Sequence, residues 1–471
     1  MARLTPASAF TGDYFLNNDG DIFYYVANSP DGRSLYQRDI LEDEVTVLSK
    51  DLSGWGITHD KKGENLFILT NSGIKKINLS SGKTTPVKFE AEYTRRPAQE
   101  REYIYHHAWQ QVKDKFHDVN LHGTDWDFYG KEYAKFLPYI NNNQDFAEML
   151  SELLGELNAS HTGASARTSA KALPTASLAV FSDESHTADG LKIAEVLKQS
   201  PMASKKVNAR KGDIITMIDG VDIKAGHDFN ELLEGKAGKK IKLGITRADG
   251  KSEVVFVKPV TSAKMSQMLY NRWIERNAAV VDSVSGGRIG YVHVRGMDSP
   301  SFRDVYDKLL GKYRNCEAVV VDTRYNGGGW LHNDIAILLN GQEYVRFTPR
   351  GHYIGSEPFS QWTKPSVMLV NESNYSDAHG TPFVYQSLKI GDVVGAPVPG
   401  TMTAVWWETQ IDPSLVFGIP QVTSLDMNGQ QLENKQLTPD VIIYNTPENV
   451  MKGIDDQLIG ATKHLMKKLS K

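Results

Sequence analysis

Apolar residues recur along this chain with two different spacings, and the spacing changes from region to region. Over the first 92 residues they occur in short runs separated by turns, which is typical of β-strands. The run DGDIFYYVANSPDGRSLYQRDI returns approximately as KGENLFILTNSGIKKINL, so that Ile22 and Leu66 open equivalent strands. This spacing is close to the ~40–45 residues of a four-stranded repeat unit. The sequence therefore predicts two small repeated sheets in residues 1–92.

From about Pro97 the pattern becomes helical, and we expect a helical domain over residues 93–167. Two apolar stripes recur at three- and four-residue steps: Tyr105, Trp109, Val112 and Phe116, then Phe146, Leu150, Leu153 and Leu157. Asp145 is placed to cap the second helix. The tetrapeptide SHTG, residues 160–163, follows directly on this helical pattern.

A stretch of small residues, 164–177, indicates a linker or a weakly paired strand. After it the strands LAVF and KIKLGITR enclose the hairpin RKGDIITMIDGVDI and a helix at DFNELLEG. This order resembles a PDZ domain, and we expect one over residues 168–268. Such domains add an extended peptide to a sheet edge. The alternative is a small barrel that binds no ligand.

The remaining residues, 269–471, alternate strands with helices, as a layered α/β domain does. CEAVVVDTR and SVMLVN predict buried strands, and YNGGGW follows the first of them as a glycine turn. HNDIAILLN, SDAHGTPFVYQSLKIG and the amphipathic segment NVMKGIDDQLIGATKHLMKKL predict helices. Trp330, Trp406 and Trp407 could line a pocket, but buried packing is the commoner role for such aromatic residues.

Composition narrows the class of protein. The net charge of −4 and a pI near 6.4 argue against nucleic-acid binding. Cys316 is the only cysteine, no apolar run is long enough to span a membrane, and MARLTPASAF lacks the features of a secretory signal. We expect a cytoplasmic protein, or a periplasmic one if a preceding signal is missing from this chain. HExxH and metal-ligand spacings are absent, so we expect no metal and no cofactor.

Candidate chemistry begins at Ser376, which follows a buried strand and precedes a helix. There, free backbone amides and the positive helix end favour developing negative charge. Polar residues that end a strand are also typical of an ordinary loop. A serine nucleophile needs a base. His379 lies three residues further on, and His161 lies far away in SHTG. The residues alone leave both histidines open.

The combination of SHTG, the PDZ-like insertion, DTRYNGGGW, the Ser-Asp pair at 376–377 and ENKQLTPDV resembles the tricorn protease family. These are serine peptidases related to the C-terminal processing peptidases, and the likeness covers residues 97–471. The resemblance implies a multidomain α+β chain. Its parts would be partial β-propeller blades, a small helical domain, a PDZ-like domain and a layered α/β peptidase domain of ClpP/crotonase-like type.

The resemblance also implies a catalytic tetrad. Ser376 matches the family's nucleophile and His161 its general base, while Ser160 and Glu433 match the pair that orients the histidine. The oxyanion hole would use an amide of Gly328 or Gly329 and the amide of Asp377. C-terminal processing peptidases instead use a lysine about two dozen residues after the serine. The matching stretch here, GAPVPGTMTA, contains no lysine, which favours the histidine mechanism.

We therefore expect a serine peptidase that cleaves short or unfolded peptides, and family analogy predicts a homo-oligomer. A rival hypothesis is a PDZ-containing scaffold that binds peptides on a degenerate hydrolase fold without turnover. A third hypothesis is an enoyl-hydratase-like lyase, because related layered folds bind coenzyme A thioesters.

Overall fold

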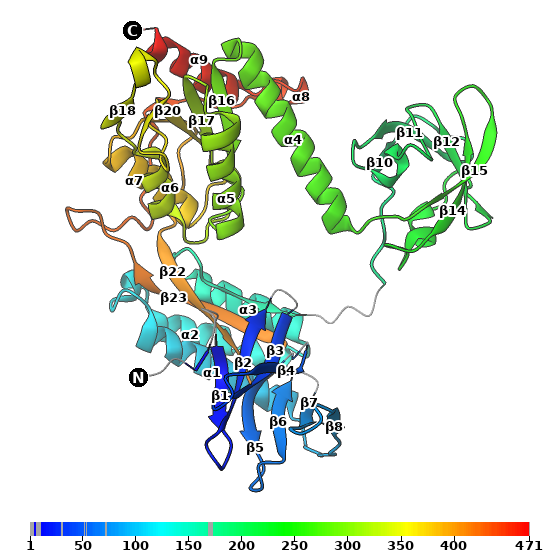
Figure 1. Ribbon diagram of the computed structural model, residues 1–471, viewed down its shortest axis with the longest axis vertical. Helices are drawn as coiled ribbons and strands as arrows, with labels where there is room; N and C mark the ends of the chain where they lie inside the picture. The colour runs from blue at the N-terminus through cyan, green and yellow to red at the C-terminus, as the bar shows by residue number, and fades with distance from the viewer. Residues whose placement is uncertain are drawn as a thin grey trace. The chain divides into compact units, whose positions relative to one another are not determined.

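The computed structural model, drawn in Figure 1, describes residues 4–5, 11–29, 32–50, 52, 54–70, 73–167 and 173–470. The chain divides into two compact units, residues 1–96 and residues 97–471, each with its own buried apolar clusters. The centre of the predicted linker, residues 168–172, lies outside the described residues. Thr175 and Ser177 beyond it form single bridges to the PDZ-like region.

The described strands of the first unit form two antiparallel sheets of four strands, each in simple sequential order. The first sheet contains β1 (Thr11–Leu16), β2 (Ile22–Ser29), β3 (Gly32–Asp39) and β4 (Val45–Ser49). The second contains β5 (Trp55–His59), β6 (Asn65–Thr70), β7 (Gly73–Asn78) and β8 (Thr84–Val87). Val26 of β2 and Ile68 of β6 meet in one buried cluster. These are the two blade-like sheets that the repeat predicts.

The predicted helical region contains α1 (Pro97–Lys115), α2 (Trp126–Ala134) and α3 (Asn143–Gly155). Both predicted stripes are part of one hydrophobic core, which also contains Leu415 and Phe417 from a distant part of the sequence. The predicted cap at Asp145 is wrong. Asn142 has an extended backbone and its side chain accepts a hydrogen bond from the Asp145 amide at 2.9 Å, so the helix starts earlier.

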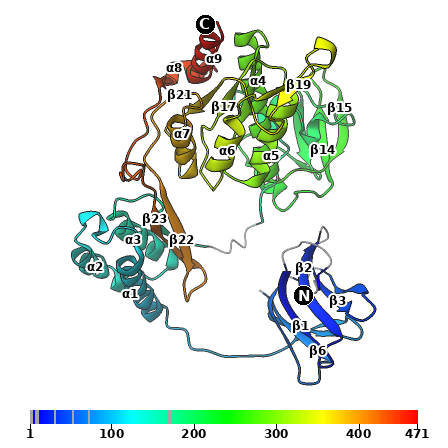
Figure 2. The ribbon, with the colours of Figure 1, turned by 60° about the vertical axis from the view of Figure 1, so that its left-hand side comes forward.

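A three-stranded sheet packs on these helices and joins distant parts of the sequence. It consists of β9 (Gly163–Ala166), β23 (Leu415–Thr423) and β22 (Thr403–Thr409), with β23 in the centre. β9 pairs antiparallel with β23, from Gly163 opposite Gly418 to Ala166 opposite Leu415. Figures 1 and 2 both show β22 and β23 beside α3. The segment that carries SHTG is thereby fixed to residues 403–423.

The PDZ-like region has the predicted strands in the sheet order β10-β11-β12-β14-β15. Its strands are β10 (Val180–Ser182), β11 (Leu191–Val196), β12 (Ile214–Ile218), β13 (Val221–Asp222), β14 (Ile241–Thr246) and β15 (Ser252–Val257). The helix predicted at DFNELLEG is a short 3₁₀ helix, Phe229–Leu233. It ends at Glu234, whose backbone is already extended, with a φ of −60° and a ψ of 129°.

A five-stranded parallel sheet forms the centre of the last region, as the alternating pattern predicts. Its order is β16 (Ile289–His293), β17 (Ala318–Asp322), β20 (Ser366–Val370), β21 (Asp392–Gly395) and β24 (Val441–Ile442). All residues of β16, β17 and β20 are buried, which explains their continuous apolar sequences. A short hairpin of β18 (Val345–Phe347) and β19 (Gly355–Glu357) lies outside this sheet.

Helices cover both faces of the parallel sheet. Val281 of α4 (Ser262–Ser285) and Leu458 of α9 (Asp456–Leu469) share one cluster with the sheet. The other face packs against α5 (Ser299–Asp307), α6 (His332–Leu339) and α7 (Asp377–Ser387). The short α8 (Pro447–Met451) precedes α9. The limits of the four predicted domains stay predictions.

A buried ion pair holds the carboxyl end of β17. Asp322 and Arg324 have exposures of 0% and 1%, and their side chains meet at 2.8 Å. Tyr291 donates a further hydrogen bond to Asp322 at 2.9 Å. Arg324 also reaches Asp455, the cap of α9, at 2.9 Å. The pair therefore fixes the point from which the glycine turn leaves the sheet.

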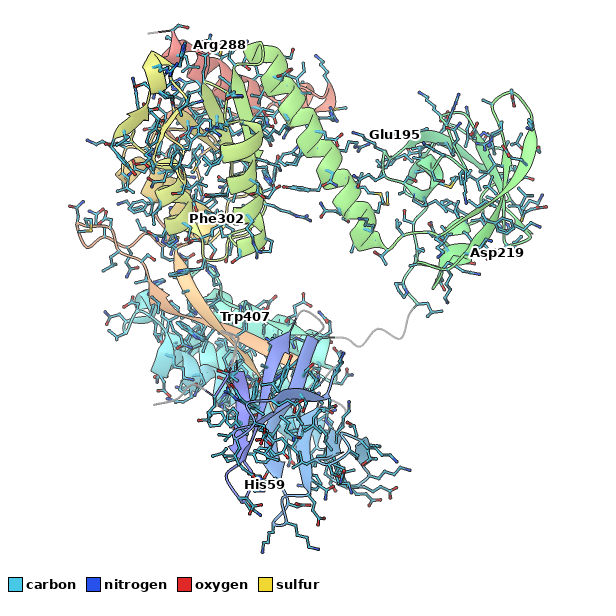
Figure 3. All side chains as sticks on the ribbon, viewed as in Figure 1. His59, Glu195, Asp219, Arg288, Phe302 and Trp407 are labelled. Atoms are coloured by element: carbon cyan, nitrogen blue, oxygen red, sulfur yellow. The ribbon has the colours of Figure 1, made fainter. Side chains whose placement is uncertain are left out.

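Replacing Asp322 by alanine is expected to lower the free energy of unfolding by about 3–5 kcal/mol, because the Arg324 charge would remain buried without its partner. Denaturant unfolding followed by tryptophan fluorescence measures this loss. The matched control is Glu317→Ala. Glu317 pairs at 2.7 Å with Arg288, labelled in Figure 3, but both side chains are more than a third exposed. Its expected cost is at most about 1 kcal/mol. Equal losses in both variants would contradict the special role of the buried pair.

Candidate active site

Ser376 lies in a sharp turn between β20 and α7. Its φ is +58° and its ψ is −128°, which is an uncommon conformation for a residue with a side chain. The turn is held by the Ser376 amide, which donates to the Thr401 hydroxyl at 2.8 Å. Gly328 packs closely against it, since a Cβ on Gly328 would lie 2.5 Å from the Ser376 Cβ. The sequence-predicted nucleophile and glycine turn are therefore in contact.

His161 precedes β9 and has a φ of +64°. Its Nδ1 lies 2.8 Å from the Ser160 hydroxyl and 3.0 Å from the Thr403 hydroxyl. Its amide donates to the Tyr375 hydroxyl at 2.8 Å, and the two rings are 4.7 Å apart between centroids. Partial burial of the imidazole lowers the pKa of His161, so that the neutral form is favoured.

Glu433 is buried, with an exposure of 5%, and both of its oxygens bind Ser160. One accepts the Ser160 amide at 2.6 Å and the other accepts the Ser160 hydroxyl at 2.9 Å. Because that hydroxyl gives its proton to Glu433, it can only accept from His161. The Thr403 hydroxyl likewise donates to the Ser160 carbonyl, at 3.3 Å. The proton of neutral His161 therefore lies on Nδ1, and Nε2 keeps its lone pair.

The link between this hydrogen-bonded chain and the serine passes through Tyr375. Among the described residues no hydrogen bond joins the side chains of His161 and Ser376, but Tyr375 precedes Ser376 and binds the His161 amide. Looser catalytic contacts are common in proteins without substrate. Ser160, Tyr375 and Glu433 line one open cavity of about 520 Å³. Three residues of the predicted tetrad, Glu433, Ser160 and His161, are thus joined directly by hydrogen bonds, and Tyr375 connects them to the residue before Ser376.

Of the two glycine amides predicted for the oxyanion hole, only one lacks an acceptor among the described residues. The Gly328 amide donates to the Asn326 side chain at 2.8 Å, so it is already occupied. In the described part of the chain, no acceptor is found for the Gly329 amide or the Asp377 amide. Met297 fixes the turn, since its amide donates to the Gly328 carbonyl at 3.1 Å. Of the predicted pair of glycines, Gly329 therefore fits an oxyanion hole with Asp377 better.

The Asp377 side chain, which the sequence did not single out, ties α7 to α6. It is 4% exposed and accepts hydrogen bonds from the amides of Leu331 and His332 and from the His332 ring. The hydrogen bond to Asp377 raises the pKa of His332. This contact fixes the position of the Gly329 amide relative to the Asp377 amide, because Leu331 directly follows the glycine turn.

His379, the other candidate base, has a different environment. It is 1% exposed, and its Nδ1 accepts the Thr401 amide at 3.3 Å. Burial lowers the pKa of His379 to about 4, which keeps it neutral. Its contact with Ser376 is a backbone hydrogen bond, from the His379 amide to the Ser376 carbonyl. The geometry therefore favours His161 over His379.

The sequence did not indicate three further residues that contact the predicted site residues: Tyr375, Thr401 and Thr403. The two threonines lie in GAPVPGTMTA, the stretch that would carry a lysine base in C-terminal processing peptidases. The prediction that the tryptophans are buried is wrong, because Trp330, Trp406 and Trp407 are more than half exposed. The last two lie on β22, an edge strand (Figure 3 labels Trp407).

The described residues contain no group of three or more metal-binding side chains close enough to hold an ion. Among the helices that the structure describes, none combines the length and the apolar content needed to cross a membrane.

Family models match three successive regions of the chain: the tricorn protease C1 domain at residues 97–155, the tricorn protease PDZ domain at 190–262 and peptidase family S41 at 288–443. "Tricorn protease homolog 1" of Streptomyces coelicolor is 26% identical over 451 residues, which cover 91% of this chain and 42% of the relative. Tricorn protease of Thermoplasma acidophilum is 22% identical over 96% of this chain and 43% of the relative.

A crystal structure of the tricorn protease has the same fold, with a TM-score of 0.83 at 18% identity over 96% of this chain and 46% of the other. This chain thus spans less than half the length of these relatives. The three regions occur here in one continuous chain, and blade-like sheets precede them. The chain belongs to the tricorn protease family and carries its C1, PDZ and S41 peptidase regions.

Proposed function

We propose that this chain hydrolyses peptide bonds in short or unfolded peptides, with Ser376 as nucleophile and His161 as general base. The observation that carries the proposal is the continuous hydrogen-bonded chain from Glu433 through Ser160 to His161. It puts the imidazole proton on Nδ1 and leaves Nε2 free to take a proton. That is the state in which a general base must wait for its substrate.

The reaction would proceed through an acyl-enzyme. Nε2 of His161 takes the proton of the Ser376 hydroxyl as the oxygen attacks the scissile carbonyl. The imidazolium then gives this proton to the leaving amine, and the peptide bond breaks. Water, deprotonated by the same imidazole, hydrolyses the ester and restores Ser376. Glu433 and Ser160 keep the imidazole in one tautomer throughout.

The negative charge on the attacked carbonyl oxygen would be held by the amides of Gly329 and Asp377. Both amides lack an acceptor among the described residues, and the second lies at the start of α7, where the helix dipole also favours an anion. A donor of this kind is typically worth about 10²–10³ in kcat. The uncommon backbone conformation of Ser376 agrees with such a role, because strain of this kind clusters at active sites.

The finer assignments are also proposals. We keep the cytoplasm as the expected compartment and a homo-oligomer as the expected assembly by family analogy. The scaffold hypothesis requires no ordered imidazole tautomer and no strained serine, so the geometry favours the peptidase.

Substituting Ser376 by alanine is expected to abolish both labelling by a serine-directed fluorophosphonate and cleavage of a mixed peptide library. The loss in kcat should be about 10⁴-fold or more, the scale typical for removal of a catalytic triad member. Mass spectrometry of the products measures the cleavage. Ser373→Ala, at an exposed serine of the same turn, is the control and should behave as the parent. Labelling or cleavage that survives Ser376→Ala, or that the parent itself lacks, would favour the scaffold.

Alanine at Gly328 is expected to lower kcat/KM by about 100-fold, as displacement of one oxyanion donor would. Gly328 has a φ of +95°, and the added methyl group would press on Ser376. Gly327→Ala is the matched control, because its methyl group would have no neighbour within 4 Å and its φ is not in the left-handed region. It should keep at least half of the activity on the same peptides. Equal activity of the two variants would contradict the packing of the glycine turn against the nucleophile.

A further inference from the structure

We infer that Tyr375 is a positioning residue for the base: its hydroxyl fixes the backbone of His161, and its ring shields the imidazole from water. This inference rests on the proposed function, and it assigns a role to a residue that is not a member of the proposed tetrad. The observations that carry it are one hydrogen bond, one ring contact and the place of Tyr375 directly before the nucleophile.

The backbone of His161 needs external support. A φ of +64° is uncommon for a residue with a bulky side chain, because the Cβ then crowds the backbone. Two successive amides are held from outside the segment: Glu433 accepts the Ser160 amide at 2.6 Å and Tyr375 accepts the His161 amide at 2.8 Å. The bond to Tyr375 fixes the position of the His161 backbone, from which the imidazole side chain extends.

Tyr375 connects all three parts of the site. Its amide donates to the Asn326 carbonyl at 3.0 Å, at the start of the glycine turn, and its carbonyl accepts the Ala378 amide at 3.1 Å, in α7. Its side chain reaches His161, and Ser376 is its neighbour in sequence. A displacement of the nucleophile turn would therefore move the base with it, so that their separation is preserved.

The ring of Tyr375 also controls the surroundings of the imidazole. The ring centroids are 4.7 Å apart and the planes are inclined by 43°, so the phenol covers one side of His161. The groups that face the imidazole are this phenol, the hydroxyls of Ser160 and Thr403 and, behind Ser160, the carboxylate of Glu433. Burial is the cause that lowers the pKa of His161. Removing the ring would hydrate the imidazole and raise that pKa.

Two substitutions separate the hydroxyl from the ring. Tyr375→Phe keeps the ring and is expected to lower kcat about tenfold, the equivalent of one ordinary hydrogen bond, with KM unchanged. Because the imidazole stays covered, the acid limb of the pH profile should not move. Tyr375→Ala should lose at least as much in kcat. It should also shift the acid limb of kcat/KM to higher pH, toward the ordinary histidine value of about 6.5.

The control is Tyr353→Phe, which removes the hydroxyl of an exposed tyrosine that bonds to Ser356. It should match the parent in kcat, KM and pH profile. A kcat of Tyr375→Phe within twofold of the parent would overturn the role of the hydroxyl. An acid limb that stays in place in Tyr375→Ala would overturn the role of the ring.

A second measurement keeps this test separate from that of the proposed function. In the Ser376→Ala background, the His161 ring is titrated by NMR with and without Tyr375→Ala, which requires no catalysis. A rise in the His161 pKa on removal of the ring supports the inference even if the chain hydrolyses nothing, and an unchanged pKa overturns it. Tyr375→Phe, which keeps the ring and differs from the parent by one oxygen, is the control in this titration and should leave the His161 pKa unchanged.

Discussion

The pairing of β9 with β23 is the interaction on which the candidate site depends. β9 is only four residues long, yet it attaches the segment of Ser160 and His161 to a strand from the far end of the chain. With this register in place, Glu433 can reach Ser160, and Tyr375 can reach His161. Without it the helical core and the parallel sheet would each keep most of their own buried residues, but the proposed base and the proposed nucleophile would separate. The proposed catalytic arrangement is therefore easier to disrupt than either of the two folded regions that supply its residues.

The sequence predicts this fold well where burial alone determines structure. The strands at 318–322 and 366–370 are continuous apolar runs, and both are buried on both sides of the sheet. The helical stripes that include Leu150 and Leu153 have a period that no strand shares. The order of the S41 and PDZ regions also follows from motifs that are specific in combination. In these regions local pattern and global fold agree.

The rest could not be predicted because it depends on contacts between distant segments. GASA, the sequence of β9, is short and rich in small residues, so the sequence predicts there no more than a linker or a weakly paired strand, and it does not identify β23 as the partner. No sequence motif marks Thr403 or Tyr375, and only the fold places their hydroxyls beside His161. The resemblance, and not the residue pattern, selected Glu433. The cap of α3 was misplaced for a local reason, because both Asn142 and Asp145 have suitable side chains.

The carboxylate of Asp377 has an electrostatic consequence for the amide of the same residue. A negative charge this close to the proposed oxyanion hole would repel the negative charge that the hole is proposed to stabilise. Here the carboxylate is turned into a buried network of three donors, two amides and one imidazole, all supplied by the segment that begins α6. These three hydrogen-bond donors partly balance the negative charge of the Asp377 carboxylate on the side that faces α6. The Asp377 amide, which has no acceptor among the described residues, can then serve as the proposed donor to an oxyanion although the carboxylate of the same residue lies nearby.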